Sequence, residues 1–231
     1  MIRVRRPREP RRFDELCRKR GNSWLEKNPG YENHPRDYWS KFEPQLRRAF
    51  KGLCAYCAMR VAVKGEVDHF VPISILKSEG HHYLAYEWSN LRYSDGTLNQ
   101  KKCDARILDP FEVRDDWFCM LLPSLQLVLT DKIPDDIRPL AEFTLERLGL
   151  RDHEALIRYR KEWFDLYRDG HLNLEGLRKN APMIARAVES DLNAGKDWRR
   201  ASKLGPPGSR GSAVPGPKSG DRKGSRPGGK G

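Results

Sequence analysis

The 231-residue sequence has few cysteines, no long apolar run and no glycine-rich loop of the kind that binds nucleotide phosphates. Its five cysteines are an odd number with one close pair, which excludes the framework of a disulfide-stabilised secreted domain. No stretch approaches the ~20 apolar residues of a membrane helix, and the arginine-rich start lacks the apolar segment of a signal peptide. These absences predict a soluble, cytoplasmic protein that does not span a membrane.

Positive charge dominates the composition, with a formal net charge of +12. A basic balance of this size favours an anionic partner, and nucleic acid is the first candidate. Residues 1–12 contain six arginines and two prolines, which predict an extended arm that either contacts phosphates or is a solvated terminus. Residues 205–231 consist almost entirely of Gly, Pro, Ser, Lys and Arg, so we expect a disordered basic tail.

Hydrophobic periodicity predicts an α+β protein in which a small core is embedded in a mainly helical chain. Apolar residues at helical spacing predict helices over 35–51, 136–148, 152–167 and 174–192. Alternating patterns predict a hairpin of 59–63 with 66–71 and a second hairpin of 117–122 with 125–130. We therefore expect four regions: a basic arm with N-terminal helices (1–50), the core (51–106), a hairpin with further helices (107–204), and the tail (205–231).

Polar side chains in the core follow an order that suits hydrolysis of a phosphodiester. Near neutral pH, His69 could take a proton from water and act as a general base. Asp68 and Asn99 offer oxygen ligands, which Mg²⁺ or Mn²⁺ would accept together with a substrate phosphate. Asn90 could hold the backbone around His69. Taken singly, each residue has a simpler explanation, such as a surface turn or the start of a helix.

Basic residues around the same segment suggest contacts to flanking phosphates. Lys102 follows Asn99 by one turn of a short helix expected over 97–105, so both side chains would face the same way. Lys101 and Arg92 are further candidates for nucleic-acid binding. Such contacts give affinity without sequence information.

Four stretches together resemble the HNH (His-Me finger) endonucleases, over about residues 50–103: CAYC at 54–57, VDHFVP at 67–72, WSNL at 88–91 and NQKK at 99–102. The resemblance implies a ββα-metal core of two strands, a loop and a helix. It also implies that His69 is the base, Asp68 and Asn99 are metal ligands, and Asn90 positions the base. The basic start, Trp39 and the CAYC segment are similar to HNH proteins of retron and Septu-type phage-defence systems, which implies antiviral defence and an ATPase partner.

One departure from the family concerns structural zinc. Many HNH proteins carry a second Cys-x-x-Cys before the final Asn, whereas residues 94–99 read SDGTLN. A closed zinc site needs four ligands, and Cys54 and Cys57 supply two, with Cys103 and Asp95 as further possibilities. The alternative is that Cys54 and Cys57 are small buried residues in a turn.

The function expected from these features is a metal-dependent HNH endonuclease, with DNA favoured over RNA as substrate. One alternative is a non-catalytic module that binds nucleic acid. Another is an interaction subunit of a defence complex, whose C-terminal helices dock on a partner protein.

Overall fold

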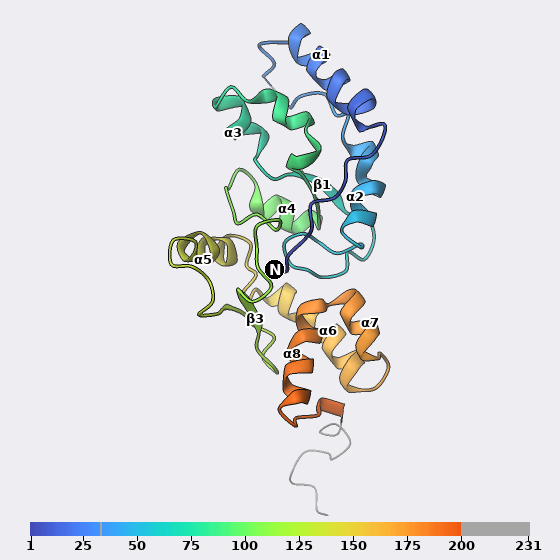
Figure 1. The fold of residues 1–231 in the computed structure, drawn as a ribbon, viewed down its shortest axis with the longest axis vertical. Helices are drawn as coiled ribbons and strands as arrows, with labels where there is room; N and C mark the ends of the chain where they lie inside the picture. The colour runs from blue at the N-terminus through green and yellow to red at the C-terminus, as the bar shows by residue number, and fades with distance from the viewer. Residues whose placement is uncertain (33, 200–231) are drawn as a thin grey trace, which may run out of the picture.

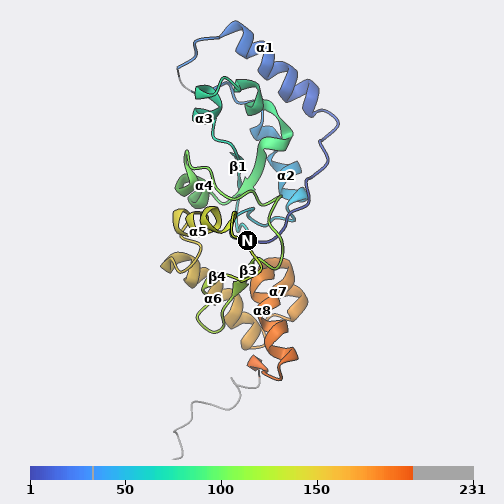
Figure 2. The same ribbon diagram turned by 60° about the vertical axis from the view of Figure 1, so that its left-hand side comes forward.

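The computed structural model describes residues 1–32 and 34–199, so the expected basic tail lies outside the described residues. The molecule is elongated, with α1 (Lys19–Lys27) near one end and α8 (Pro182–Asn193) near the other (Figures 1 and 2). Two small antiparallel sheets lie between these ends among the helices. The described part is therefore an α+β structure, as the sequence predicts.

The first sheet and the helix after it place the polar residues of the core. Strand β1 (Glu66–His69) pairs antiparallel with β2 (Leu91–Ser94), so that Asp68 lies opposite Arg92. Helix α4 (Gly96–Lys102) follows β2 directly. The Asp95 carboxylate caps its first turn and accepts hydrogen bonds from the N–H groups of Thr97 at 3.0 Å and Leu98 at 3.3 Å. The cap turns the chain back, and α4 packs on β1.

The predicted hairpin of 59–63 with 66–71 is wrong, because β1 pairs with β2 instead. The backbone of 59–63 makes its hydrogen bonds elsewhere: Arg60 N–H donates to the Asn180 carbonyl at 2.8 Å and Val61 N–H to the Gly52 carbonyl at 3.0 Å. Tertiary contacts, and not the local strand propensity of 59–63, therefore decide the pairing here, as they do in many sheets. The second hairpin is confirmed, with β3 (Phe118–Met120) antiparallel to β4 (Leu127–Leu129).

The chain between β1 and β2 is mostly helical and packs against the N-terminal region. It forms α3 (Ile73–Ser78) and two 3₁₀ helices, η3 (His82–Tyr86) and η4 (Trp88–Asn90). Of these, η3 contacts a π-helical turn, η1 (Asp14–Arg18), and α1. The approach is close at Gly21, where a Cβ atom would lie 2.1 Å from the Tyr86 ring. A side chain at this position would push η3 away from α1.

The arginine-rich N-terminal arm lies along the core. Val4 N–H donates to the Pro110 carbonyl at 3.0 Å, and Trp88 Nε1 donates to the Pro7 carbonyl at 3.0 Å. The Met1 side chain is completely buried. All six arginines of residues 1–12 are nevertheless exposed. The arm is thus fixed by its backbone and apolar residues, and it presents its charged groups to solvent.

The remaining helices follow the predicted periodicity with two changes of boundary. The segment 35–51 becomes helical at Ser40, as a 3₁₀ turn η2 (Ser40–Phe42) and α2 (Glu43–Ala49). Helices α5 (Arg138–Arg147) and α6 (Glu154–Arg168) lie where expected. The single helix expected over 174–192 is two helices, α7 (Leu174–Asn180) and α8, because Pro182 lacks an N–H and forces the preceding residue out of helical geometry. In the described residues no helix has the length and apolar character needed to cross a bilayer.

Candidate active-site cleft

A cleft of about 470 Å³ opens between β1, the start of α3 and α4. Four of the residues predicted to act in catalysis or binding line it: Asp68, His69, Asn99 and Lys102. Trp39 from the segment before α2 also lines it. Residues separated by more than thirty positions therefore meet at one hollow of the surface.

His69 ends strand β1 and is 8% exposed. Its Nε2 lies 2.9 Å from the carbonyl oxygen of Ala85. A carbonyl oxygen only accepts, so Nε2 carries the proton and Nδ1 keeps a lone pair in the neutral ring. Trp39 packs edge-on against the imidazole with ring centroids 4.5 Å apart. Burial lowers the pKa of His69 below its usual 6.5, which keeps the ring in the neutral form that a base requires.

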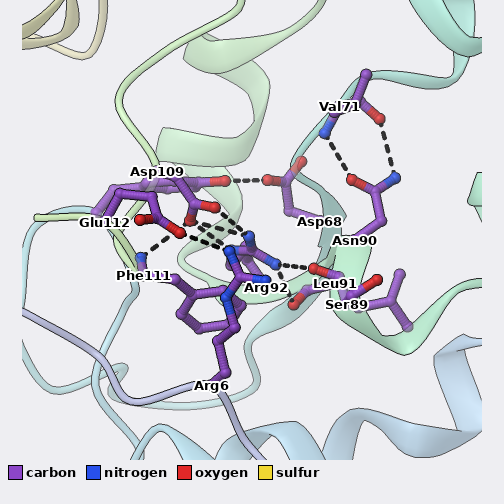
Figure 3. A network of polar contacts seen from close by, with 11 residues as sticks. Arg6, Asp68, Val71, Ser89, Asn90, Leu91, Arg92, Asp109, Phe111 and Glu112 are labelled. Carbon is purple, nitrogen blue, oxygen red and sulfur yellow. Dashed lines mark hydrogen bonds and ion pairs between the residues drawn. The ribbon is translucent and has the colours of Figure 1, made fainter.

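Asn90 joins the backbone after His69 to the segment that carries Ala85. Its Oδ1 accepts from the N–H of Val71 at 2.8 Å, and its Nδ2 donates to the carbonyl of Val71 at 3.2 Å (Figure 3). Nδ2 also donates to the carbonyl of Leu84 at 3.3 Å. Three hydrogen bonds from one amide thus fix the two chain segments on either side of the imidazole. This geometry is compatible with the orienting role predicted for Asn90.

Asp68 is buried and held by two donors. The Tyr56 hydroxyl donates to its Oδ2, and Lys102 Nζ donates to its Oδ1 at 3.0 Å. The same ammonium donates to the carbonyl of His69 at 2.7 Å. Burial first, and then the charge of Asp68, raise the pKa of Tyr56 well above its usual value, so its hydroxyl stays protonated as a donor.

Lys102 is only 1% exposed. With its ammonium bound to Asp68 and His69, it is not available as the phosphate contact that its sequence position suggests. The reason is geometric: Asn99 and Lys102 share a face of α4 as expected, but that face packs on β1. The structure therefore assigns Lys102 to the support of Asp68.

Asn99 and Glu66 lie on the more solvent-exposed side of the cleft residues. Asn99 Nδ2 donates to Glu66 Oε2 at 2.8 Å, which leaves the side-chain oxygen Oδ1 of Asn99 for a ligand. Glu66 lies two residues before Asp68 on β1, so both side chains project from the same face of the strand. Glu66 was not among the predicted site residues, although its position two residues before Asp68 in a predicted strand would have placed it on the same face.

The oxygen donors of the cleft suit a hard divalent cation. Within the described residues no three or more His, Cys, Asp or Glu side chains cluster as metal ligands. Mg²⁺, however, is usually held by one or two protein oxygens, several waters and substrate phosphate. Two protein groups could supply such oxygens. Asp68 keeps the lone pairs that Tyr56 and Lys102 do not use, and Asn99 offers its side-chain Oδ1.

Arg92 is buried in a polar network on β2 (Figure 3). Its guanidinium binds both carboxylate oxygens of Asp109, with Nη2 at 2.9 and 2.8 Å, and it lies 3.6 Å from the centroid of the Phe111 ring. It also donates to the carbonyls of Ser89 at 2.7 Å and Leu91 at 3.0 Å. The structure gives Arg92 this structural role in place of the phosphate contact predicted from the sequence.

Replacing Arg92 by lysine should lower the free energy of unfolding by about 2 kcal/mol, because a lysine keeps the charge but loses the planar fork that binds Asp109. Urea denaturation followed by tryptophan fluorescence measures the change. Arg114→Lys is the matched control, since Arg114 is exposed. An unchanged midpoint for Arg92→Lys would show that the bidentate geometry contributes little.

Lys101 lies on another face of α4 from Lys102. It is partly exposed and lines a second, smaller cavity together with Cys54 and Cys57. Both cysteines are buried free thiols. Asp95 and His153 line the same cavity, but within the described residues no three His, Cys, Asp or Glu side chains are grouped closely enough to hold a metal ion.

No family model, curated protein or solved structure matches the chain. The function proposed below therefore rests on the geometry of the cleft and on the order of motifs in the sequence.

Proposed function

We propose that the chain is a metal-dependent endonuclease of the HNH type that hydrolyses phosphodiester bonds in nucleic acid. The observation that carries the proposal is the state of His69. It is a neutral imidazole with Nε2 bound to the Ala85 carbonyl, and it lies in the same cleft as Asp68 and Asn99. The order strand, strand, helix around these residues supports a ββα unit of the same type.

The chemistry assigned to the cleft is activation of a water by a positioned base. His69 Nδ1 accepts the proton of the water that attacks phosphorus, while the Ala85 carbonyl and the Asn90 clamp keep the ring in place. Asp68 and Asn99 would hold Mg²⁺ or Mn²⁺, which when bound stabilises negative charge on the leaving oxygen. Tyr56 and Lys102 fix the Asp68 carboxylate.

Affinity for the substrate would come from cations outside the cleft. The exposed arginines of the arm and the partly exposed Lys101 are available for phosphate contacts. Such contacts are sequence-independent and weaken as salt rises. We propose DNA as the first substrate to test; a role in phage defence beside an ATPase partner rests on the resemblance in sequence alone.

Cleavage should require a divalent ion. Supercoiled plasmid DNA and a structured RNA are incubated with the purified protein in Mg²⁺, Mn²⁺ or EDTA, and products are resolved on gels. Asn99→Ala should raise the Mg²⁺ concentration needed for half-maximal cleavage, because one of two protein oxygens is lost. Gln100→Ala, an exposed neighbour in the same cleft, is the matched control. Cleavage that persists in EDTA would contradict the metal-dependent mechanism.

A non-catalytic nucleic-acid-binding module is the second candidate, and the position of Lys102 favours it. The ammonium of Lys102 already neutralises Asp68, so the site is stable without a metal. A binding module would retain DNA in EDTA, lose it steeply with added salt, and cut under none of the metal conditions.

A further inference from the structure

Cys54 and Cys57 begin and end a tight turn that brings their sulfur atoms together. The N–H of Ala58 donates to the Cys54 carbonyl at 3.0 Å, and the N–H of Cys54 donates to the Met59 carbonyl at 2.9 Å. Ala58 takes up the left-handed φ of 57° that closes the turn. In this arrangement the Cys57 thiol forms a hydrogen bond with the sulfur of Cys54.

The surroundings of the pair favour a thiolate at Cys54. Burial opposes ionisation, but hydrogen bonds from the Cys57 thiol and from backbone N–H groups outweigh it and lower the pKa of Cys54 to about 7. One of these donors is the N–H of Tyr56, 3.4 Å from Cys54 Sγ. The pKa of Cys57 is raised, because its proton is shared with Cys54 and because it is buried. One sulfur is thus the nucleophile and the other holds the proton, as in redox-active Cys-x-x-Cys pairs.

A buried arginine near the pair has no carboxylate partner among residues 1–32 and 34–199. Arg160 is completely buried, and its guanidinium donates to the carbonyls of Leu125 at 2.9 Å, Arg151 at 3.3 Å and Leu150 at 2.6 Å. Its Nε has no hydrogen-bond partner in the described structure. Burial lowers the pKa of Arg160, and negative charge on Cys57 raises it. Arg160 in turn lowers the pKa of Cys57, so this buried cation stabilises the negative charge that Cys57 develops when its thiol reacts.

Small reagents can reach the pair through the second cavity. Cys54 and Cys57 line a hollow of about 170 Å³ that also contains Lys101 and His153. The hollow is several times the ~30 Å³ that one water molecule occupies. A molecule of the size of hydrogen peroxide fits in this cavity.

We propose that Cys54 and Cys57 are a redox-active dithiol that closes to a disulfide when a peroxide oxidises it. The Cys54 thiolate attacks one peroxide oxygen, the O–O bond breaks, and hydroxide leaves, so that Cys54 becomes a sulfenic acid. The Cys57 thiol then attacks that sulfur and water leaves. Two thiols and one hydrogen peroxide give one disulfide and two waters, with sulfur oxidised and peroxide oxygen reduced.

The turn is coupled to the cleft through Tyr56. Tyr56 lies between the two cysteines, is completely buried, and donates its hydroxyl to Asp68. Because a disulfide has its own fixed geometry, its formation changes the backbone of the turn and moves the Tyr56 hydroxyl. Oxidation should therefore lower cleavage, a part of the proposal that rests on the proposed function.

Mass spectrometry of the full chain tests the dithiol directly. After treatment with hydrogen peroxide and alkylation of free thiols, the tryptic peptide 52–60 carries both cysteines. We expect this peptide to escape alkylation and to lose about 2 Da, two hydrogen atoms, and dithiothreitol should reverse the change. Cys57→Ser should stop at the sulfenic acid, and Cys119→Ser, which alters an exposed cysteine, should behave as the natural chain.

The outcomes separate the dithiol from the nuclease. Peptide 52–60 remaining reduced while Cys119 is oxidised would overturn the proposal, as would one tightly held zinc ion per chain that protects both thiols. A disulfide that leaves cleavage unchanged would overturn the coupling through Tyr56. Absence of cleavage in the reduced protein would count against the proposed function, while the mass of the peptide still decides the dithiol.

Discussion

Replacing His69 by alanine should lower the cleavage rate by about 10²- to 10⁴-fold, the usual contribution of a general base. The imidazole supplies the only base that the proposal assigns, and the Ala85 carbonyl and Asn90 serve to position it. Nucleic-acid binding should persist, because the exposed cations that contact phosphate are elsewhere. The measurement is a single-turnover cleavage assay beside a fluorescence-anisotropy titration of the same DNA.

The pH dependence gives His69 a second signature. Its pKa is lowered by burial, so cleavage should rise with pH through a value below 6.5 and remain flat above 6.5. Stability follows the same group: the unfolded imidazole titrates near 6.5, while the folded one titrates lower. The contribution to stability is complete above pH 6.5 and is lost as pH falls toward the folded pKa. His69→Ala should remove this loss, whereas His171→Ala, at an exposed histidine, should keep it.

Two results would contradict the assignment of the base. Retained cleavage in His69→Ala would mean that another group activates the water. A rate that falls as pH rises from 6 to 8 would mean that the protonated ring is the active form, contrary to the burial of His69 and its bond to the Ala85 carbonyl.

Local patterns predicted the parts of the fold that depend on local interactions. Helices α5 and α6 follow from apolar residues at helical spacing, and β3 with β4 from alternating residues around Pro123 and Ser124. The partner of β1 was not predictable in this way, since β2 lies more than twenty residues further along the chain. Strand pairing across such a separation is decided by packing, which no local pattern records.

The same limit explains why Lys102 and Arg92, predicted to contact phosphates, have structural roles instead. Asp68, His69, Asn99 and Lys102 do meet at one cleft. Yet the burial of Lys102 depends on how α4 lies against β1, and the burial of Arg92 depends on Asp109 and Phe111. The carbonyl of Ala85 is a backbone group that every residue carries, so its contact with His69 leaves no mark in the sequence.

Replacing Lys102 by methionine should lower the free energy of unfolding by about 3–5 kcal/mol, because it leaves the Asp68 carboxylate buried without its ion-pair partner. Asp68 and Lys102 have side chains only 6% and 1% exposed, so their contact is largely shielded from water. The His69 carbonyl loses a donor as well. Lys101→Met, on the same helix but partly exposed, is the matched control and should change stability little. Urea denaturation in EDTA gives the numbers.

The double variant Asp68→Asn/Lys102→Met separates charge from packing. Removing both charges should recover part of the stability, since no uncompensated carboxylate remains. Two results would show that the ion pair does not support Asp68. One is that Lys102→Met is as stable as Lys101→Met. The other is that the double variant loses as much free energy of unfolding as Asp68→Asn and Lys102→Met lose when their separate losses are added.

Mg²⁺ added to Lys102→Met decides between the two roles of Asp68. Without the ammonium, the carboxylate is left for a hard cation, and a cation bound only to the folded state stabilises it by RT ln(1 + [Mg²⁺]/Kd). At a hundred times Kd this amounts to about 2.7 kcal/mol, enough to restore much of the loss. Asp68→Asn/Lys102→Met, which has no carboxylate at this position, should show no such gain. Equal response of the two variants to Mg²⁺ would show that Asp68 is a structural partner of Lys102 and not a metal ligand.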